Sequence, residues 1–76
     1  ARQWEFRTEG PVFSAPVVAS DTVYVGSTDT HLYALNAKRG SLRWKYRADN
    51  KIYTSPTVND GVVYFASVNG SLYAIQ

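Results

Sequence analysis

The chain repeats its own sequence after forty residues, and the second copy follows the first without a gap. Ten pairs of residues forty positions apart are identical. These pairs are Trp4 and Trp44, Arg7 and Arg47, Pro16 and Pro56, Val18 and Val58, Val23 and Val63, Tyr24 and Tyr64, Ser27 and Ser67, Leu32 and Leu72, Tyr33 and Tyr73, and Ala34 and Ala74. A fixed period of this length predicts a repeat architecture, in which each unit buries one face only against its neighbours.

A single copy of this chain is short of buried surface. A chain of 76 residues buries only about 60% of the surface that its unfolded form exposes. The sequence has no cysteine for a disulfide, and its single histidine, His31, has no second imidazole or thiolate with which to bind zinc. Oligomerisation is the remaining source of buried area, so we expect the chain to associate with further copies of itself.

The composition argues against two classes of partner. A formal net charge of +2 is too small to indicate nucleic-acid binding. No apolar run approaches the roughly 20 residues of a membrane helix, so membrane insertion is not expected. The sequence starts at Ala1 without an initiator methionine or the apolar core of a signal peptide, which is typical of a mature, excised or engineered segment.

Short apolar stretches alternate with turn residues, and no 3.6-residue period persists, so the chain is predicted to be all-β. The predicted strands cover residues 14–19, 22–27, 31–36 and 41–48 in the first unit and residues 54–59, 62–68 and 71–76 in the second. Asp60-Gly61 and Asn69-Gly70 are predicted to form two-residue hairpin turns with positive φ. Pro16 and Pro56 lack an amide hydrogen, which predicts that the first strand of each unit lies at a sheet edge.

The last strand of the first unit alternates apolar and basic side chains, which is typical of an outer strand with one buried face. Its apolar side chains are Leu42, Trp44 and Tyr46, and its basic side chains are Arg43, Lys45 and Arg47. Trp4 and Phe6 alternate with polar residues in the same way near the N-terminus. Four antiparallel strands in about 40 residues are typical of one β-propeller blade.

Counting the strands divides the chain unevenly. Residues 1–9 are predicted to be an outer strand that completes the blade of a neighbouring chain. Residues 10–48 form a complete blade, and residues 49–76 form the first three strands of a second blade. The chain is therefore expected to carry two blades whose termini meet the termini of other copies.

The turn between the last two strands of the first unit carries a recognisable motif. Residues 34–44 read ALNAKRGSLRW, which resembles the A-x-D-x-x-T-G-x-x-x-W signature of the quinoprotein-type (PQQ-like) β-propeller repeat. Residues 14–18 and 23–27 resemble the S-x-P-x-V and V-Y-V-G-S strands of that family. Asn36 and Arg39 replace the usual Asp and Thr. In the family the outer-strand Trp packs against a neighbouring blade near the turn glycine, so the resemblance implies that Trp44 packs near Gly40.

The resemblance also implies a ring. Members of this family typically form eight blades, and some are quinone-dependent alcohol dehydrogenases, whereas others are non-enzymatic scaffolds, including a periplasmic factor for outer-membrane protein assembly. Four copies of a two-blade chain would supply eight blades, with residues 2–8 of one copy beside residues 71–76 of the next. A cyclic homotetramer is favoured, with a trimer of six blades as the alternative. The expected structural and interface residues are Trp4, Phe6, Gly40, Trp44, Tyr46, Leu72, Tyr73 and Ile75.

No set of residues in the sequence predicts catalysis. His31 begins a strand without a partner, and four aspartates, Asp21, Asp29, Asp49 and Asp60, sit at turns, where a carboxylate caps local amides. Glu5 and Glu9 are expected at the surface. The serines Ser14, Ser27, Ser55 and Ser67 lack a nucleophile-elbow pattern. The alternation places the rings of Trp44 and Tyr46 opposite the basic side chains, which favours a core stripe over a single-stranded nucleic-acid site.

The sequence thus predicts a non-catalytic β-propeller building block that assembles with itself and has no cofactor or metal. Two alternatives stay open, namely a fragment of a quinone-dependent dehydrogenase and a scaffold that binds a peptide or protein. The resemblance suggests a periplasmic or extracytoplasmic origin, although the sequence itself carries no signal peptide and leaves the compartment unknown.

Overall fold

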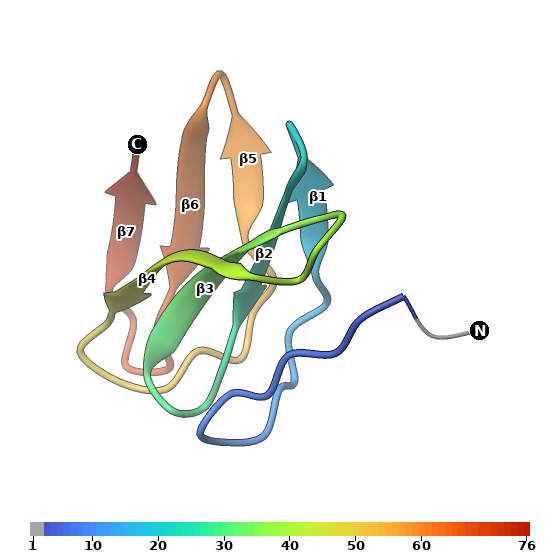
Figure 1. Cartoon of the computed structure of the whole chain (residues 1–76). Coiled ribbons are helices and arrows are strands. Elements are labelled where there is room, and N and C mark those ends of the chain that lie inside the picture. Colours follow the sequence, from blue (N-terminus) through green and yellow to red (C-terminus); the bar gives the residue numbers. More distant parts are fainter. Residues whose placement is uncertain (1–2) are drawn as a thin grey trace.

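The computed structural model describes residues 3–76 and contains two antiparallel sheets that pack against each other (Figure 1). The first sheet has four strands in the order β1 (Val17–Ala19), β2 (Thr22–Gly26), β3 (His31–Asn36) and β4 (Leu42–Arg47). The second has three strands, β5 (Thr57–Asn59), β6 (Val62–Ala66) and β7 (Leu72–Ile75). The predicted all-β fold is confirmed, and the two sheets match the two predicted blades.

The two sheets share one pairing register, shifted by forty residues. Val17 lies opposite Tyr24 in the first sheet, and Thr57 lies opposite Tyr64 in the second. In the same way Val23 pairs with Leu35, and Val63 pairs with Ile75. Repetition of the sequence therefore produces repetition of the backbone, strand by strand.

The inner edge strands begin later than predicted, at Val17 and Thr57 rather than at residues 14 and 54. Ser14 explains the difference in the first blade, because its hydroxyl both accepts from the Gly26 amide and donates to the Gly26 carbonyl, each at 2.9 Å. A side chain thus replaces the backbone partner at the end of β2. The predicted edge position is confirmed for β1 and β5, each of which follows a proline.

The turns that join the first three strands of each blade are of two kinds, whereas the sequence predicted one. Ser20 and Asp21 have φ of 51° and 61°, and Asp60 and Gly61 have φ of 51° and 77°, as two-residue turns of positive φ require. The β6–β7 turn is different, because Gly70 has positive φ and its amide donates to the carbonyl of Ser67 at 3.1 Å. The prediction of a two-residue Asn69-Gly70 turn is therefore wrong; the loop is longer, with one left-handed residue at its end.

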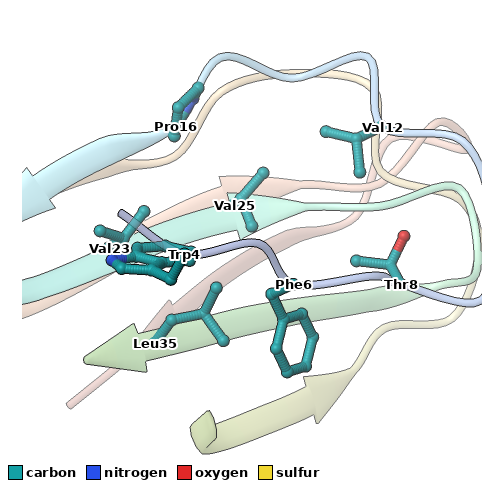
Figure 2. Close-up of a pocket in the computed structure, with 8 residues that line it drawn as sticks. All are labelled: Trp4, Phe6, Thr8, Val12, Pro16, Val23, Val25 and Leu35. Atoms are coloured by element: carbon teal, nitrogen blue, oxygen red, sulfur yellow. The ribbon is translucent and has the colours of Figure 1, made fainter. Parts of the chain in front are cut away.

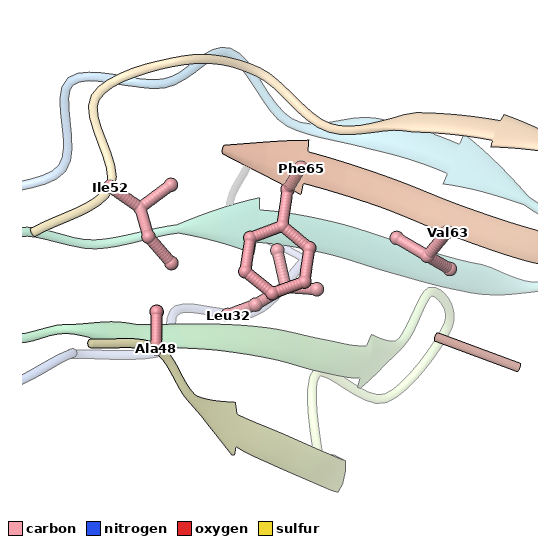
Figure 3. Close-up of a cluster of buried hydrophobic side chains, with 5 residues drawn as sticks. All are labelled: Leu32, Ala48, Ile52, Val63 and Phe65. Carbon is pink, nitrogen blue, oxygen red and sulfur yellow. The ribbon is translucent and has the colours of Figure 1, made fainter. Parts of the chain in front are cut away.

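The hydrophobic core lies between the two sheets (Figure 3). Five buried side chains form it: Leu32, Ala48, Ile52, Val63 and Phe65. Leu32 comes from the first sheet and reaches the face of the second, which supplies Val63 and Phe65. The side chains packed around this cluster are Tyr24, Trp44, Val58, Tyr73 and Ile75. Each blade thus buries its face against the other, as expected for a repeat architecture.

The N-terminal segment belongs to neither sheet. From residue 3 to residue 9 its side chains are exposed and half-buried in strict alternation, although it is paired to no strand. Trp4, Phe6 and Thr8 are the half-buried ones, and they lie over the first blade (Figure 2). Such alternation is the pattern of a β-strand with one covered face. Residues 1 and 2 of the predicted outer strand lie outside the described residues.

Candidate functional site

Trp4 fixes the N-terminal segment on the first blade. Its indole Nε1 donates a hydrogen bond to the carbonyl of Ala37 at 2.8 Å. The ring lies directly on Gly40, where an added β-carbon would overlap the indole and stand 2.7 Å from its Cγ. Gly40 has φ of +74°, so this turn needs glycine both for its backbone and for its contact with the ring.

The prediction that Trp44 packs on Gly40 is therefore wrong, because the ring on Gly40 belongs to Trp4. Trp44 lies opposite Ala34 in the sheet and packs against the core cluster, with its ring 6.0 Å from that of Tyr24. The physical reason is the direction in which the side chain points. An outer-strand tryptophan packs on the blade that follows its strand, and not on the blade to which its strand belongs. Trp4 belongs to the strand before the first blade, and Trp44 covers the second blade.

Beside Trp4 the molecule has an apolar cavity of about 330 Å³, which we call the Trp4 cavity (Figure 2). The N-terminal segment lines one side with Trp4, Phe6 and Thr8. Phe6 is held there by the ring of Tyr33, whose centroid lies 5.6 Å from its own. These contacts leave the apolar faces of the segment turned toward the first sheet.

Side chains of the first blade complete the Trp4 cavity. Val23, Val25 and Leu35 come from β2 and β3, and Val12 and Pro16 come from the loop before β1. Val12 keeps 46% of its surface exposed. The cavity is therefore lined almost wholly by hydrocarbon and opens on the side of the first blade that faces away from the second.

At the opposite end of the chain, β7 is more exposed than its counterpart in the first blade, β3. Leu32, Tyr33, Ala34 and Leu35 of β3 are all buried, whereas in β7 Leu72 and Ala74 are exposed and Tyr73 and Ile75 are only half-buried. Leu32 has no exposed surface and Leu72 has 83%. Because β7 ends its sheet and pairs only with β6, it also leaves one edge of its backbone open. We call Leu72, Tyr64 and this open edge the Leu72 face.

A carboxylate fastens each blade at the turn before its third strand. In the first blade Asp29 accepts hydrogen bonds from the amides of Glu9 and His31, each at 2.9 Å, and from the hydroxyl of Tyr33. Burial raises the pKa of Asp29, but these hydrogen bonds outweigh it and hold the pKa below its ordinary value. Burial and the neighbouring Asp29 carboxylate raise the pKa of Tyr33.

The second blade carries its carboxylate on a different residue. Asp49 accepts hydrogen bonds from the Ser71 hydroxyl at 2.6 Å and from the Asn69 amide at 3.0 Å. The Ser71 hydroxyl is the main cause that lowers the pKa of Asp49, and Ser67 and Asn69 lower it further. Tyr73 accepts a hydrogen bond from the Asp49 amide at 2.8 Å. Both carboxylates thus join the end of one outer strand to the next blade.

Three further candidates from the sequence, His31, Ser27 and Ser55, also have structural partners. His31 Nδ1 lies 3.2 Å from the carbonyl of Asp29 and 3.5 Å from its carboxylate. Ser27 is buried and donates to Thr8 Oγ1 at 3.0 Å, and Ser55 accepts from the amide of Ala15 at 2.8 Å. These contacts tie the loops to the blades and bring no nucleophile and base together.

The predicted aromatic stripe of β4 covers the second blade. Tyr46 lies 6.3 Å from Phe65 and 5.8 Å from Tyr73, measured between ring centroids. Phe65 and Tyr73 are themselves stacked at 4.9 Å. Arg43, Lys45 and Arg47 are exposed. Tyr46 of the first blade thus packs on Tyr73 of the second, Ile75 packs against the core cluster, and Leu72 is exposed.

Within residues 3–76, no three side chains of His, Cys, Asp or Glu gather to hold a metal ion. In the same range no buried side-chain nitrogen or oxygen lacks a hydrogen-bond partner. The described residues also contain no helix of the length and apolarity that crossing a membrane requires.

Comparison with protein families identifies the repeat. The model of the family described as outer membrane protein assembly factor BamB matches residues 1–76, the whole chain. The chain belongs to this family of PQQ-like propeller repeats. No curated protein matches it in sequence.

Solved structures support the same assignment. A europium-containing methanol dehydrogenase is similar to this PQQ-like repeat chain, with a TM-score of 0.71 and 25% sequence identity. The similarity covers 97% of this chain and 12% of that enzyme. The chain therefore corresponds to a small part of the enzyme, and the match supports its strands as propeller blades.

Several residues of the site were not predicted from the sequence. Val12, Val25 and Ile52 were not among the predicted interface residues, and neither was Gly26. The signal that would have found them is the forty-residue offset itself, because Val12 and Ile52 are counterparts, one beside the open cavity and one in the core.

Proposed function

We propose that this chain is a non-catalytic β-propeller building block that closes a ring with further copies of itself. The observation that carries the proposal is the contrast between β3, which is covered on both sides, and β7, whose Leu72 is 83% exposed. An open strand edge with exposed apolar side chains favours the addition of another strand.

The N-terminal segment supplies a suitable strand. Residues 3–9 have the alternation of an outer strand but belong to neither sheet, and they already lie on the first blade. In the β3–β4 pair, Leu32 lies opposite Tyr46 and Ala34 lies opposite Trp44. Shifted by forty residues, this register places Leu72 of one copy opposite Phe6 of the next, and Ala74 opposite Trp4.

This contact is heterologous, because it joins two different surfaces of the chain. Heterologous contacts produce closed rings when the rotation per subunit divides a full turn. Four copies would give eight blades, the number that the family resemblance implies, and three would give six. No reaction is part of this proposal, because the hydroxyl, imidazole and carboxylate groups described above are engaged in contacts between loops and blades.

The match to the methanol dehydrogenase favours a second candidate. The chain aligns along 97% of its length with 12% of that enzyme. In a longer polypeptide the next blade of the same chain would cover β7, and the two blades would be part of the scaffold of a quinone-dependent dehydrogenase. A ring that binds a peptide or protein is a further form of the first proposal.

The test is the mass of the assembled protein, measured by native mass spectrometry and by light scattering after size exclusion. A chain of 8.5 kDa is expected to give a tetramer of about 34 kDa, or a trimer of about 26 kDa. Hydrogen exchange of residues 72–75 should slow when the assembly forms, because their outward amides gain partners. A folded monomer at every concentration would overturn self-assembly and favour the fragment of a longer chain.

A further inference from the structure

The Trp4 cavity has a filled counterpart within the same chain. Forty residues after Thr8, Val12, Val23 and Val25 stand Ala48, Ile52, Val63 and Phe65, and these four are all members of the hydrophobic core. Trp44 and Ile75, the counterparts of Trp4 and Leu35, pack against the same core. The second blade therefore has a surface equivalent to the Trp4 cavity, and in the second blade this surface is buried in the core.

Leu32 covers this surface in the second blade. It is the one core member that has no counterpart among the cavity residues, and it is fully buried (Figure 3). Tyr24 packs beside it from β2. The counterparts of these two residues are Leu72 and Tyr64, which are 83% and 45% exposed. The chain thus carries an unfilled apolar cavity on its first blade. On its second blade it carries Leu72 and Tyr64, the counterparts of the two side chains that cover the equivalent surface within the chain.

A second, independent relation concerns size. In the chain, Ile52 packs so closely on Gly26 that an added β-carbon would overlap its Cγ2 and stand 3.0 Å from its Cβ. The counterpart of Gly26 is Ala66, which is larger by one carbon, and the counterpart of Ile52 is Val12, which is smaller by one. Ala66 lies in a depression of about 190 Å³ that Tyr64 and Leu72 also line. The pair of Ala66 and Val12 therefore has the same total number of side-chain carbons as the pair of Gly26 and Ile52. Close packing between neighbours requires such a conserved volume.

We infer that the Leu72 face of one copy docks on the Trp4 cavity of a second copy, with Leu72 and Tyr64 entering the cavity and Val12 packing on Ala66. This inference rests on the proposed self-assembly and names the contact that would hold the ring together. The occupant is a second copy because the chain itself contains the same contact between its two blades.

The test is the variant Leu72→Asp, compared with Val68→Asp. Both side chains are exposed in the single chain, at 83% and 55%, so neither change should disturb its fold. The hydroxyl of Thr28, the counterpart of Val68, donates to the carbonyl of Pro11 in the loop before its own blade, so Val68 should stay outside the contact between copies. Assembly of Leu72→Asp should need at least about 100-fold more protein, because the contact would bury a carboxylate without a partner. Val68→Asp should assemble like the unchanged chain.

The size relation gives a second test. Val12→Ile and Ala66→Gly should each weaken assembly about 3-fold to 10-fold, and the double variant should recover most of the loss, because it copies the pair formed by Gly26 and Ile52. Circular dichroism of the diluted variants checks their fold.

The outcomes separate the two proposals. If the unchanged chain stays monomeric, self-assembly is wrong and this contact is wrong with it. If the unchanged chain assembles and Leu72→Asp assembles equally well, the ring stands and the contact is wrong. Additive effects of the two size variants would overturn the packing of Val12 on Ala66.

Discussion

The indole of Trp4 lies on Gly40 and leaves no room for a β-carbon between them. These residues are thirty-six positions apart, and their contact fastens the strand that precedes the first blade to the last turn of that blade. The hydrogen bond from Nε1 to the carbonyl of Ala37, at 2.8 Å, sets the angle of the ring.

This contact predicts that Gly40→Ala destabilises the chain by about 2 to 4 kcal/mol, because strain at positive φ and overlap with the ring add together. Gly61→Ala is a matched control, since Gly61 has φ of +77° and nothing within 4 Å of an added β-carbon. The free energy of unfolding of Gly61→Ala should fall only by the cost of backbone strain at positive φ, about 1 kcal/mol. Urea unfolding followed by Trp fluorescence measures both, and equal losses would contradict a steric role for Trp4.

Thr30→Gly should stabilise the chain by about 0.5 to 1 kcal/mol, because a β-branched residue is strained in the left-handed region. Thr30 has φ of 79°, and its counterpart Gly70 has φ of 97°. The carbonyl of Thr30 accepts a hydrogen bond from the amide of Ala48 at 2.7 Å, and the substitution leaves this bond intact. Thermal unfolding measures the change, and Gly70→Thr should shift the melting temperature in the opposite direction. A lower melting temperature for Thr30→Gly would show that the threonine side chain contributes more than its strain costs.

Acid should weaken the second blade through Asp49. Hydrogen bonds from Ser71, Ser67 and Asn69 lower the pKa of Asp49 below its ordinary value in the folded chain. The folded state therefore binds this proton less tightly than the unfolded state. The stabilisation is fully present above the ordinary pKa of about 4 and is lost as the pH falls below it toward the lowered pKa. Asp49→Asn should flatten this acid limb in urea unfolding at a series of pH values.

Ser71→Ala is the companion variant for that measurement. It removes the hydroxyl that lowers the pKa of Asp49 most and should flatten the same limb while leaving the carboxylate in place. An acid limb unchanged in both variants would mean that other carboxylates govern the loss of stability.

Ala15→Ser should strengthen assembly. Within the chain the amide of Ala15 donates to the hydroxyl of Ser55 at 2.8 Å and joins the segments that precede β1 and β5. In the corresponding contact between copies, the amide of Ser55 would face residue 15 of the next copy. Ala15 has no hydroxyl to accept this hydrogen bond. A serine there would add one hydrogen bond at each contact, worth about 1 kcal/mol or roughly a 5-fold lower concentration for half-assembly. Sedimentation velocity over a dilution series measures the shift, and no gain would argue against equal geometry at the two kinds of contact.

The predicted division into blades depended on local patterns, and these are reliable where one residue type dictates one geometry. Pro16 and Pro56 cannot donate to a ladder, so they marked the edges β1 and β5 correctly. Asp60-Gly61 likewise marked a tight hairpin. Where a side chain substitutes for backbone, as Ser14 does at Gly26, the pattern extended the strand too far, because alternation does not reveal which group supplies the hydrogen bond.

The sequence by itself determined the repeat, the all-β class and the strand order within each blade, because these follow from a forty-residue period, alternation and turn chemistry. Only the tertiary structure decided which blade each outer strand covers. Trp4 and Trp44 are identical in sequence, but one lies on Gly40 and the other packs against the core, because each tryptophan meets the blade that follows it in space. The different exposure of Leu32 and Leu72 has the same cause: identical side chains are buried or exposed according to whether a neighbouring blade covers them.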